Sequence, residues 1–104
     1  MAQRKVAAST TAAIVAPNQV PFLLNARDFK YGKPVVSVTG LATSETITFY
    51  IKAGTTWLAV ADSAGTPISF TATYQSDIFN GPGEYGYIKD ATAGAIALYV
   101  DSGI

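Results

Sequence analysis

The sequence predicts an all-β fold in which short antiparallel strands pack as a small sandwich. From Val35 onward, apolar and polar residues alternate with a period of two, which is typical of half-buried strands. Clusters of Gly, Pro, Asn and Asp interrupt this alternation at near-regular intervals, as turns between short strands do. No amphipathic helix of useful length is present in the pattern. We therefore expect a small antiparallel β-sandwich of jelly-roll or immunoglobulin-like type, with a small β-barrel as the alternative.

Six strands are predicted, at residues 35–39, 46–52, 57–61, 68–74, 85–89 and 95–100. β-Branched and aromatic residues dominate these segments, as a pleated sheet prefers. In the second strand Ile47, Phe49 and Ile51 share one face, whereas Thr, Tyr and Lys side chains share the other. This division predicts that one face of the strand is buried and the other meets solvent.

The fourth and sixth strands complete the predicted core. Every second residue from Ile68 to Tyr74 is apolar, which predicts one continuous strand over this stretch. In the sixth strand Ile96, Leu98 and Val100 form the more apolar face. Turn residues separate the strands at positions 40, 53–54, 62–67, 80–83 and 90–94.

The first third of the chain differs from the rest. Pro17, Pro21 and Pro34 each restrict the preceding residue to extended conformations. The stretch before them is rich in Ala, Ser and Thr and has little periodicity. We therefore expect an extended N-terminal arm at residues 1–34, followed by the sandwich body at residues 35–104.

The charge of the chain is divided unevenly along its length. Residues 1–33 hold five basic and one acidic side chain, a net charge of +4, whereas residues 34–104 hold two basic and six acidic, a net charge of −4. A basic leading segment on an acidic body favours association with other acidic surfaces, including neighbouring copies of the chain. Charged residues make up only 13% of the chain, about half the usual share of roughly 25%. This low share indicates a surface that is covered by something else.

The residue types that are missing exclude several kinds of chemistry. The chain has no cysteine and no histidine, which removes disulfides, thiolate metal sites, cysteine nucleophiles and the commonest general base. Asp62, Asp77 and Asp90 fall in the turns and connections between predicted strands, where aspartate ordinarily caps the backbone. No apolar run approaches the ~18 residues that a transmembrane helix needs. We predict no enzymatic activity, no catalytic residue, no metal, no cofactor and no membrane partner.

Residues 81–86 match the Gly-x-Gly-x-x-Gly pattern of dinucleotide-binding loops. That function requires a helix after the loop, so that the helix N-terminus meets the pyrophosphate. Here residues 87–89 predict a strand, and Pro82 lacks the N–H that a phosphate cradle uses. We interpret the motif as a tight loop that leads into a strand.

The aromatic and basic residues raise two other binding functions. A glycan-binding module would stack sugars on an aromatic platform made by Trp57, Tyr50, Tyr74, Tyr85, Tyr87 and Tyr99. The alternative is that Trp57 is a core residue and the tyrosines line strand faces. The basic residues are not interleaved with aromatic ones, and the body is acidic, so no direct nucleic-acid binding is expected.

The stretch from Gly83 to Val100 resembles the last hairpin of small virion proteins of tailed bacteriophages, in particular capsid decoration (cement) proteins. The Ser/Thr/Ala-rich leader, the short body and the lack of Cys and His are similar as well. The resemblance implies a non-enzymatic protein located on the capsid surface of a virion. It also implies that many copies bind the major capsid protein and one another and hold neighbouring capsid subunits together.

The candidate contact residues all lie in the predicted arm: Arg4, Lys5, Phe22, Leu23, Leu24, Arg27, Lys30 and Lys33. The apolar cluster at residues 20–24 allows two interpretations, a docking plug in an extended arm or the first core strand. Two functions are alternatives to capsid decoration: a tail or head–tail connector component, and the glycan-binding module. The arm hypothesis predicts that deletion of residues 1–20 leaves a folded body that no longer binds capsids.

Overall fold

The structure, a computed structural model, describes residues 3–30, 32–61 and 64–101. Within these ranges the chain forms nine strands and two short 3-10 helices. In chain order they are β1 (Gln3–Thr10), η1 (Pro17–Gln19), β2 (Phe22–Leu24), η2 (Ala26–Phe29), β3 (Val35–Thr39), β4 (Ile47–Ala53), β5 (Thr56–Ala59), β6 (Ser69–Phe70), β7 (Ser76–Ile78), β8 (Gly83–Lys89) and β9 (Ile96–Asp101).

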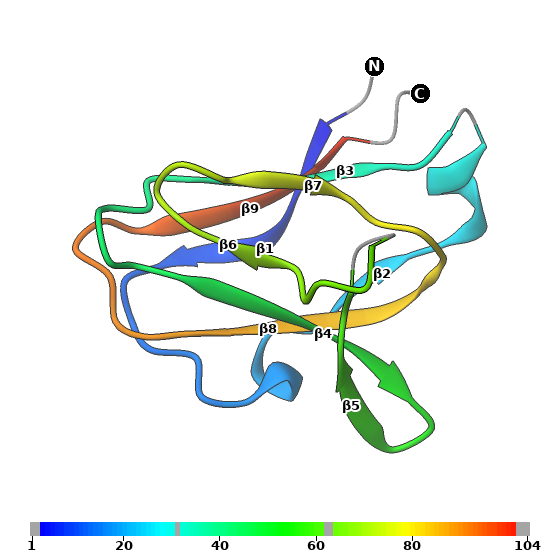
Figure 1. Ribbon diagram of the computed structural model, residues 1–104, viewed down its shortest axis with the longest axis horizontal. Coiled ribbons are helices and arrows are strands. Elements are labelled where there is room, and N and C mark those ends of the chain that lie inside the picture. The colour runs from blue at the N-terminus through cyan, green and yellow to red at the C-terminus, as the bar shows by residue number, and fades with distance from the viewer. Residues whose placement is uncertain (1–2, 31, 62–63, 102–104) are drawn as a thin grey trace.

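The strands form two antiparallel sheets that pack face to face (Figure 1). The four-stranded sheet has the order β1-β9-β3-β7, and the five-stranded sheet has the order β2-β8-β4-β5 with β6 paired to β4. The predicted all-β sandwich is therefore confirmed. The strands form two separate sheets and not the single closed sheet of the alternative barrel.

Each of the last two strands takes an inner position in one of the two sheets. β8 lies between β2 and β4 in one sheet, and β9 lies between β1 and β3 in the other. The alternation predicted for β9 is confirmed, because Ile96, Leu98 and Val100 are all buried. The turn at residues 90–95 thus carries the chain from the middle of one sheet to the middle of the other.

The core centres on the ring of Phe49 in β4. Four aromatic rings surround it, with centroid distances of 6.5 Å to Phe22, 4.7 Å to Phe70, 5.3 Å to Phe79 and 6.0 Å to Tyr87. Most of these pairs are edge-on or tilted, an arrangement that aromatic quadrupoles favour. These side chains lie between residues 22 and 87, so this aromatic cluster joins β2 to β4, β6 and β8.

The strand predicted over residues 68–74 is shorter than the sequence indicated. β6 ends at Phe70, and Thr71 and Tyr74 then exchange backbone hydrogen bonds of 2.9 and 3.2 Å around a tight turn. The turn reverses the chain into β7, a strand that the sequence did not predict. Tyr74 consequently leaves the apolar face and is 48% exposed.

The predicted arm at residues 1–34 is not a separate element. β1 is an edge strand of the four-stranded sheet, and β2 is an edge strand of the five-stranded sheet. Between them, the backbone of Ile14 pairs with Lys89 of β8 through two hydrogen bonds of 2.9 and 3.0 Å. Deletion of residues 1–20 would therefore remove part of the sandwich, and we no longer expect it to leave the body intact.

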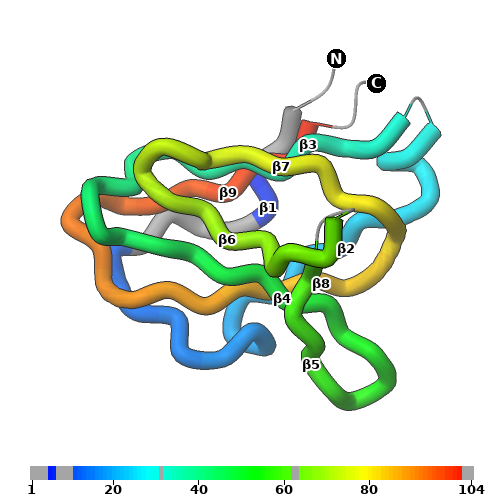
Figure 2. The backbone as a smooth tube through the Cα atoms, viewed as in Figure 1, coloured from blue at the N-terminus to red at the C-terminus, as the bar shows by residue number. Residues whose placement is uncertain are grey.

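The hairpin of β4 and β5 extends away from the rest of the sandwich (Figure 2). Its strands pair from Tyr50↔Ala59 to Ala53↔Thr56. Leu58 is 51% exposed although it pairs with Ile51 of the inward face, because little of the sandwich lies opposite this part of the hairpin.

Candidate protein interface

A groove of about 540 Å³ lies between the edge strands of the two sheets. We call it the edge groove, and its walls are Lys5, Val6, Pro21, Phe22, Leu23 and Glu84. β1 supplies one wall and β2 the other, so the groove runs along the side where neither sheet continues. A sheet edge of this kind is where an extended segment of another chain can add.

The alternation of β2 decides which of its residues reach the groove. Pairing of Phe22 with Tyr85 and of Leu23 with Glu84 points successive side chains to opposite faces of the sheet. Phe22 faces inward, stacks on the Tyr85 ring at 5.8 Å and is 4% exposed. Leu23 faces outward and is 62% exposed. β2 therefore gives the groove two apolar side chains: Phe22 at its buried base and Leu23 at its exposed rim.

The opposite wall contains an irregularity in the β1–β9 pairing. The register shifts between Lys5 and Ala7, and irregularities at a sheet edge commonly redirect side chains. Lys5 and Val6 are neighbours in sequence, yet both line the groove. Lys5 is exposed, so the groove carries a positive charge on its β1 wall.

The charges on the outer face of the five-stranded sheet are already paired. Lys52 Nζ lies 3.8 Å from Glu84 Oε1, and it lies 5.9 Å from the centre of the Trp57 ring. An exposed pair of this kind contributes at most about 1 kcal/mol to stability. The groove lining therefore holds one cation, Lys5, and one carboxylate, Glu84, which has the Lys52 amine beside it.

Three of the eight predicted contact residues, Lys5, Phe22 and Leu23, come together in the edge groove. Leu24 does not, because it is 1% exposed within the core. The docking-plug interpretation of residues 20–24 is corrected accordingly: Phe22 and Leu24 are core residues, and only Leu23 projects outward. The backbone of Arg4 pairs with Val100, and its side chain lies outside the described part of the structure.

The remaining three predicted residues, Arg27, Lys30 and Lys33, lie on η2 and the segment after it and do not line the groove. The Asn25 and Asp28 side chains hold η2 in place, because each accepts a backbone N–H across the turn at 3.1 and 2.9 Å. Lys33 Nζ donates to Asn80 Oδ1 at 3.0 Å. These exposed cations form a second basic surface at the β2–β3 connection.

The glycine motif at residues 81–86 forms no nucleotide loop. Gly83 and Gly86 lie within β8, and no helix follows them. Gly86 has a packing reason, since a Cβ at this position would overlap the carbonyl oxygen of Pro17 in η1. Glu84, which the sequence analysis did not select, is the motif residue that faces the edge groove.

The aromatic platform proposed for a glycan site is not assembled. Tyr85 and Tyr87 are buried in the core at 2% and 1% exposure. Tyr74 lies at the turn before β7, on another part of the molecule. Trp57 is half-buried on the β4–β5 hairpin and has Lys52 over its ring. The interpretation of Trp57 as a core residue is therefore also wrong, because the hairpin holds it on the outer face.

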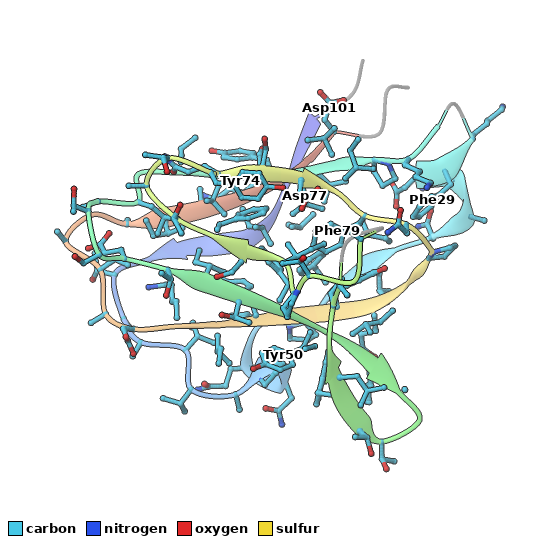
Figure 3. The ribbon with its side chains drawn as sticks, in the orientation of Figure 1. Phe29, Tyr50, Tyr74, Asp77, Phe79 and Asp101 are labelled. Carbon is cyan, nitrogen blue, oxygen red and sulfur yellow. The ribbon has the colours of Figure 1, made fainter. Side chains whose placement is uncertain are left out.

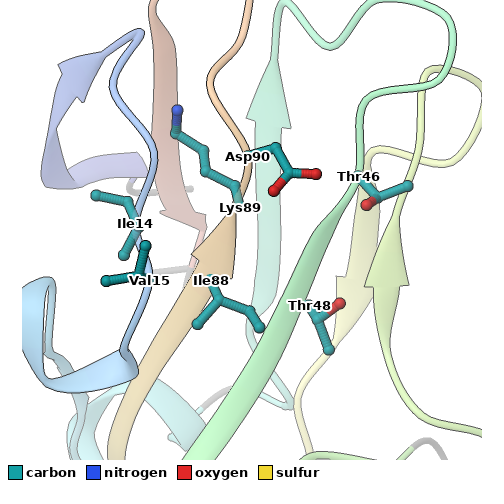
Figure 4. Close-up of a pocket in the computed structure, with 7 residues that line it drawn as sticks. All are labelled: Ile14, Val15, Thr46, Thr48, Ile88, Lys89 and Asp90. Atoms are coloured by element: carbon teal, nitrogen blue, oxygen red, sulfur yellow. The ribbon is translucent and has the colours of Figure 1, made fainter.

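A smaller pocket of about 290 Å³ lies where the chain crosses from β1 to η1 (Figure 4). Its lining residues are Ile14, Val15, Thr46, Thr48, Ile88, Lys89 and Asp90. Lys89 is 4% exposed, and its Nζ donates to the Ala12 carbonyl at 2.7 Å and to Thr92 Oγ1 at 3.3 Å. Burial lowers the pKa of Lys89, and the Glu45 carboxylate opposes this effect. The amine thus ties the N-terminal segment to β8.

In the described parts of the chain, no three or more Asp, Glu, His or Cys side chains come together as metal ligands would. The same residues include no helix with the length and apolarity needed to span a membrane. Comparison with known proteins finds no matching family model, no similar curated protein and no similar solved structure.

Proposed function

We propose that the protein is a non-enzymatic structural protein of a bacteriophage virion, which binds the capsid exterior across neighbouring subunits and stabilises the shell. The observation that supports this proposal is the edge groove. Two sheet edges lie side by side there, with Leu23 exposed on one wall and Lys5 exposed on the other. Such a groove suits an extended protein segment, because strand edges bind backbone and apolar walls bind side chains.

The physical demands of the proposed role agree with these features. A protein that holds a shell together must bind across a seam, and it needs no reacting groups. Many weak contacts are sufficient when many copies act together, because linked binding events reinforce one another. The low share of charged residues, 13% of the chain, suits a surface that is covered in an assembly.

Counting copies in particles tests the proposal. Purified virions would be analysed by quantitative mass spectrometry and by immunogold electron microscopy with antibodies to this chain. Hundreds of copies per particle on the outside of the shell would support capsid decoration. A few copies or a few dozen, confined to the tail or the connector, would replace it with the alternative structural role. Absence of the chain from virions would overturn both.

A matched pair of variants tests the groove itself. Leu23→Asp places a charge on the groove rim, whereas Leu58→Asp places the same charge on the β4–β5 hairpin at similar exposure, 62% against 51%. We expect Leu23→Asp to weaken binding to undecorated capsids by about tenfold or more, the effect of about 1.4 kcal/mol. Leu58→Asp is expected to bind as the unchanged chain does. Equal effects of the two substitutions would contradict a role of the groove.

A further inference from the structure

The two edges of the four-stranded sheet have opposite chemical character. β1 forms one edge, and it presents Lys5 to the edge groove. β7 forms the other edge, and its three residues are Ser76, Asp77 and Ile78. Ile78 is 49% exposed, and Tyr74, at the turn before the strand, is 48% exposed. One edge thus presents an exposed cation beside a groove with apolar walls, and the other presents a carboxylate with exposed apolar side chains.

The Asp77 carboxylate is held in a fixed position on the β7 edge. Tyr74 Oη donates to Asp77 Oδ2 at 2.7 Å, and the backbone N–H of Ile78 donates to Oδ1 at 2.7 Å. Figure 3 shows Tyr74 and Asp77 next to one another at this edge of the sandwich. A carboxylate has about four lone-pair positions in all, so each oxygen can still accept a bond from a cation.

We propose that the occupant of the edge groove is the β7 edge of a second copy of the chain. This contact rests on the proposed virion function, in which the groove strengthens binding to the shell by joining neighbouring copies to one another. Ile78 of one copy then packs against Val6 and Leu23 of the other. Asp77 pairs with Lys5. Three extended residues span roughly 10 Å, which matches the length of β2, the three-residue strand on one side of the groove.

Charge and apolar surface are both complementary in this contact, and they come from different edges of one chain. The interface is therefore heterologous: each copy uses its β7 edge on one side and its edge groove on the other. A heterologous contact repeats until it closes into a ring or continues as a row. Both outcomes place copies side by side, as coverage of a shell requires.

Zero-length cross-linking tests the contact on the full-length protein in solution. Within one molecule β9 and β3 separate β1 from β7, which places the two edges roughly 14 Å apart at the usual strand spacing. A carbodiimide amide bond between Lys5 and Asp77 can therefore form only between copies. In a mixture of ¹⁴N- and ¹⁵N-labelled protein, we expect a Lys5–Asp77 cross-linked peptide of mixed label. The Lys52–Glu84 pair, at 3.8 Å within one molecule, is the internal control and should be unmixed.

Charge reversal provides the second test, read as self-association by sedimentation velocity over a range of concentrations. Lys5→Glu and Asp77→Lys are each expected to weaken association about tenfold or more, and the double variant Lys5→Glu/Asp77→Lys is expected to restore it to within about threefold. If Asp77→Lys does not fold, Ile78→Ser is used in its place and should weaken association alone. Thermal melting checks that each variant is folded.

Two results would overturn the inference: monomers at every concentration with only the Lys52–Glu84 cross-link, or a folded double variant that associates as weakly as the single ones. Neither result involves capsids, so each leaves the proposed virion function standing if the chain is found on the shell. Conversely, a Lys5–Asp77 cross-link between copies would support the contact even if the chain is absent from virions. In that case only the proposed virion function would be overturned.

Discussion

Two segments of the chain each contribute to both sheets, and they differ in where they lie. β8 and β9 occupy inner positions, whereas β1 and β2 occupy the edges beside them, β1 on β9 and β2 on β8. The inner pair is buried on most positions, while the edge pair leaves Lys5 and Leu23 exposed along the groove. The inner strands thus hold most of the buried side chains, and the edge strands hold the exposed side chains of the proposed interface. The following predictions test how sharp that division is.

Leucine truncations should give the largest effect. Leu98 in β9 and Leu24 in β2 are both 1% exposed, and Leu→Ala at either position is expected to lower the free energy of unfolding by about 2–5 kcal/mol. Leu23→Ala, in the same edge strand, should change it by less than about 0.5 kcal/mol. Urea denaturation measures all three. A cost at Leu23 equal to that at Leu24 would remove the distinction between the two faces of the edge strand.

Substitution of Gly86 tests how closely η1 packs against the inner strand β8. Gly86→Ala places a Cβ against the backbone of Pro17, and the resulting overpacking is expected to cost about 1–3 kcal/mol. Gly81→Ala is the matched control, since a Cβ there has no atom within 4 Å. Thermal melting should therefore separate the two variants by several degrees. Equal melting temperatures would mean that η1 moves away from β8 at no cost.

Lys89 links the N-terminal segment to β8, and its replacement should change the free energy of unfolding by an amount that depends on pH. Lys89→Met leaves the Ala12 carbonyl without its 2.7 Å donor, at an expected cost of about 1–3 kcal/mol. Because burial lowers the pKa of Lys89 below its ordinary 10.5, the unfolded chain binds this proton more tightly than the folded chain does. The free energy of unfolding of the unchanged protein should consequently rise, relative to the variant, as pH increases toward that value. Denaturation at pH 7, 8, 9 and 10 measures this difference, and a flat difference would contradict it.

The smallest effects are expected from the two buried tyrosines of β8. Tyr85 Oη donates to the Gly81 carbonyl at 2.6 Å, so Tyr85→Phe should cost about 0.5–1.5 kcal/mol. The hydroxyl of Tyr87 is buried with no hydrogen-bond partner among the described residues, and Tyr87→Phe should be neutral or slightly stabilising. Burial raises the pKa of both phenols above 10.0. Stability should therefore fall as pH rises above that value, and Tyr87→Phe should reduce this loss.

The fold was predictable where side chains alternate strongly. Residues such as Phe49 and Leu98 lie in strands whose alternation directly reports a buried face. β7 was missed because it offers a single large apolar residue, Ile78, and because the turn before it, at residues 72–73, contains neither Gly nor Pro. β2 was open to two interpretations, since the prolines around it are equally typical of an arm.

The site was predictable only in its parts. Lys5 and Leu23 could be selected for charge and apolarity, but nothing local indicates that they lie on opposite walls of one groove. That arrangement depends on pairing of β2 with β8 over 59–63 residues of sequence and of β1 with β9 over 86–98 residues. Glu84 could have been selected from alternation within β8, where it points opposite to Tyr85. Its neighbours across the strands, Leu23 and Lys52, follow from the topology alone.

The pairing of β1 with β9, from Gln3↔Asp101 to Thr10↔Ile96, has a consequence for biosynthesis. A ribosome produces β1 and β2 first, but the strands that receive them are made last. The nascent chain therefore cannot complete either sheet until almost all of it has left the exit tunnel. Long-range pairing of this kind slows folding and prolongs the exposure of unpaired strands. We expect the sandwich to form in a single late step, once β9 has left the ribosome, and Leu23 and the other apolar edge residues to stay exposed until then.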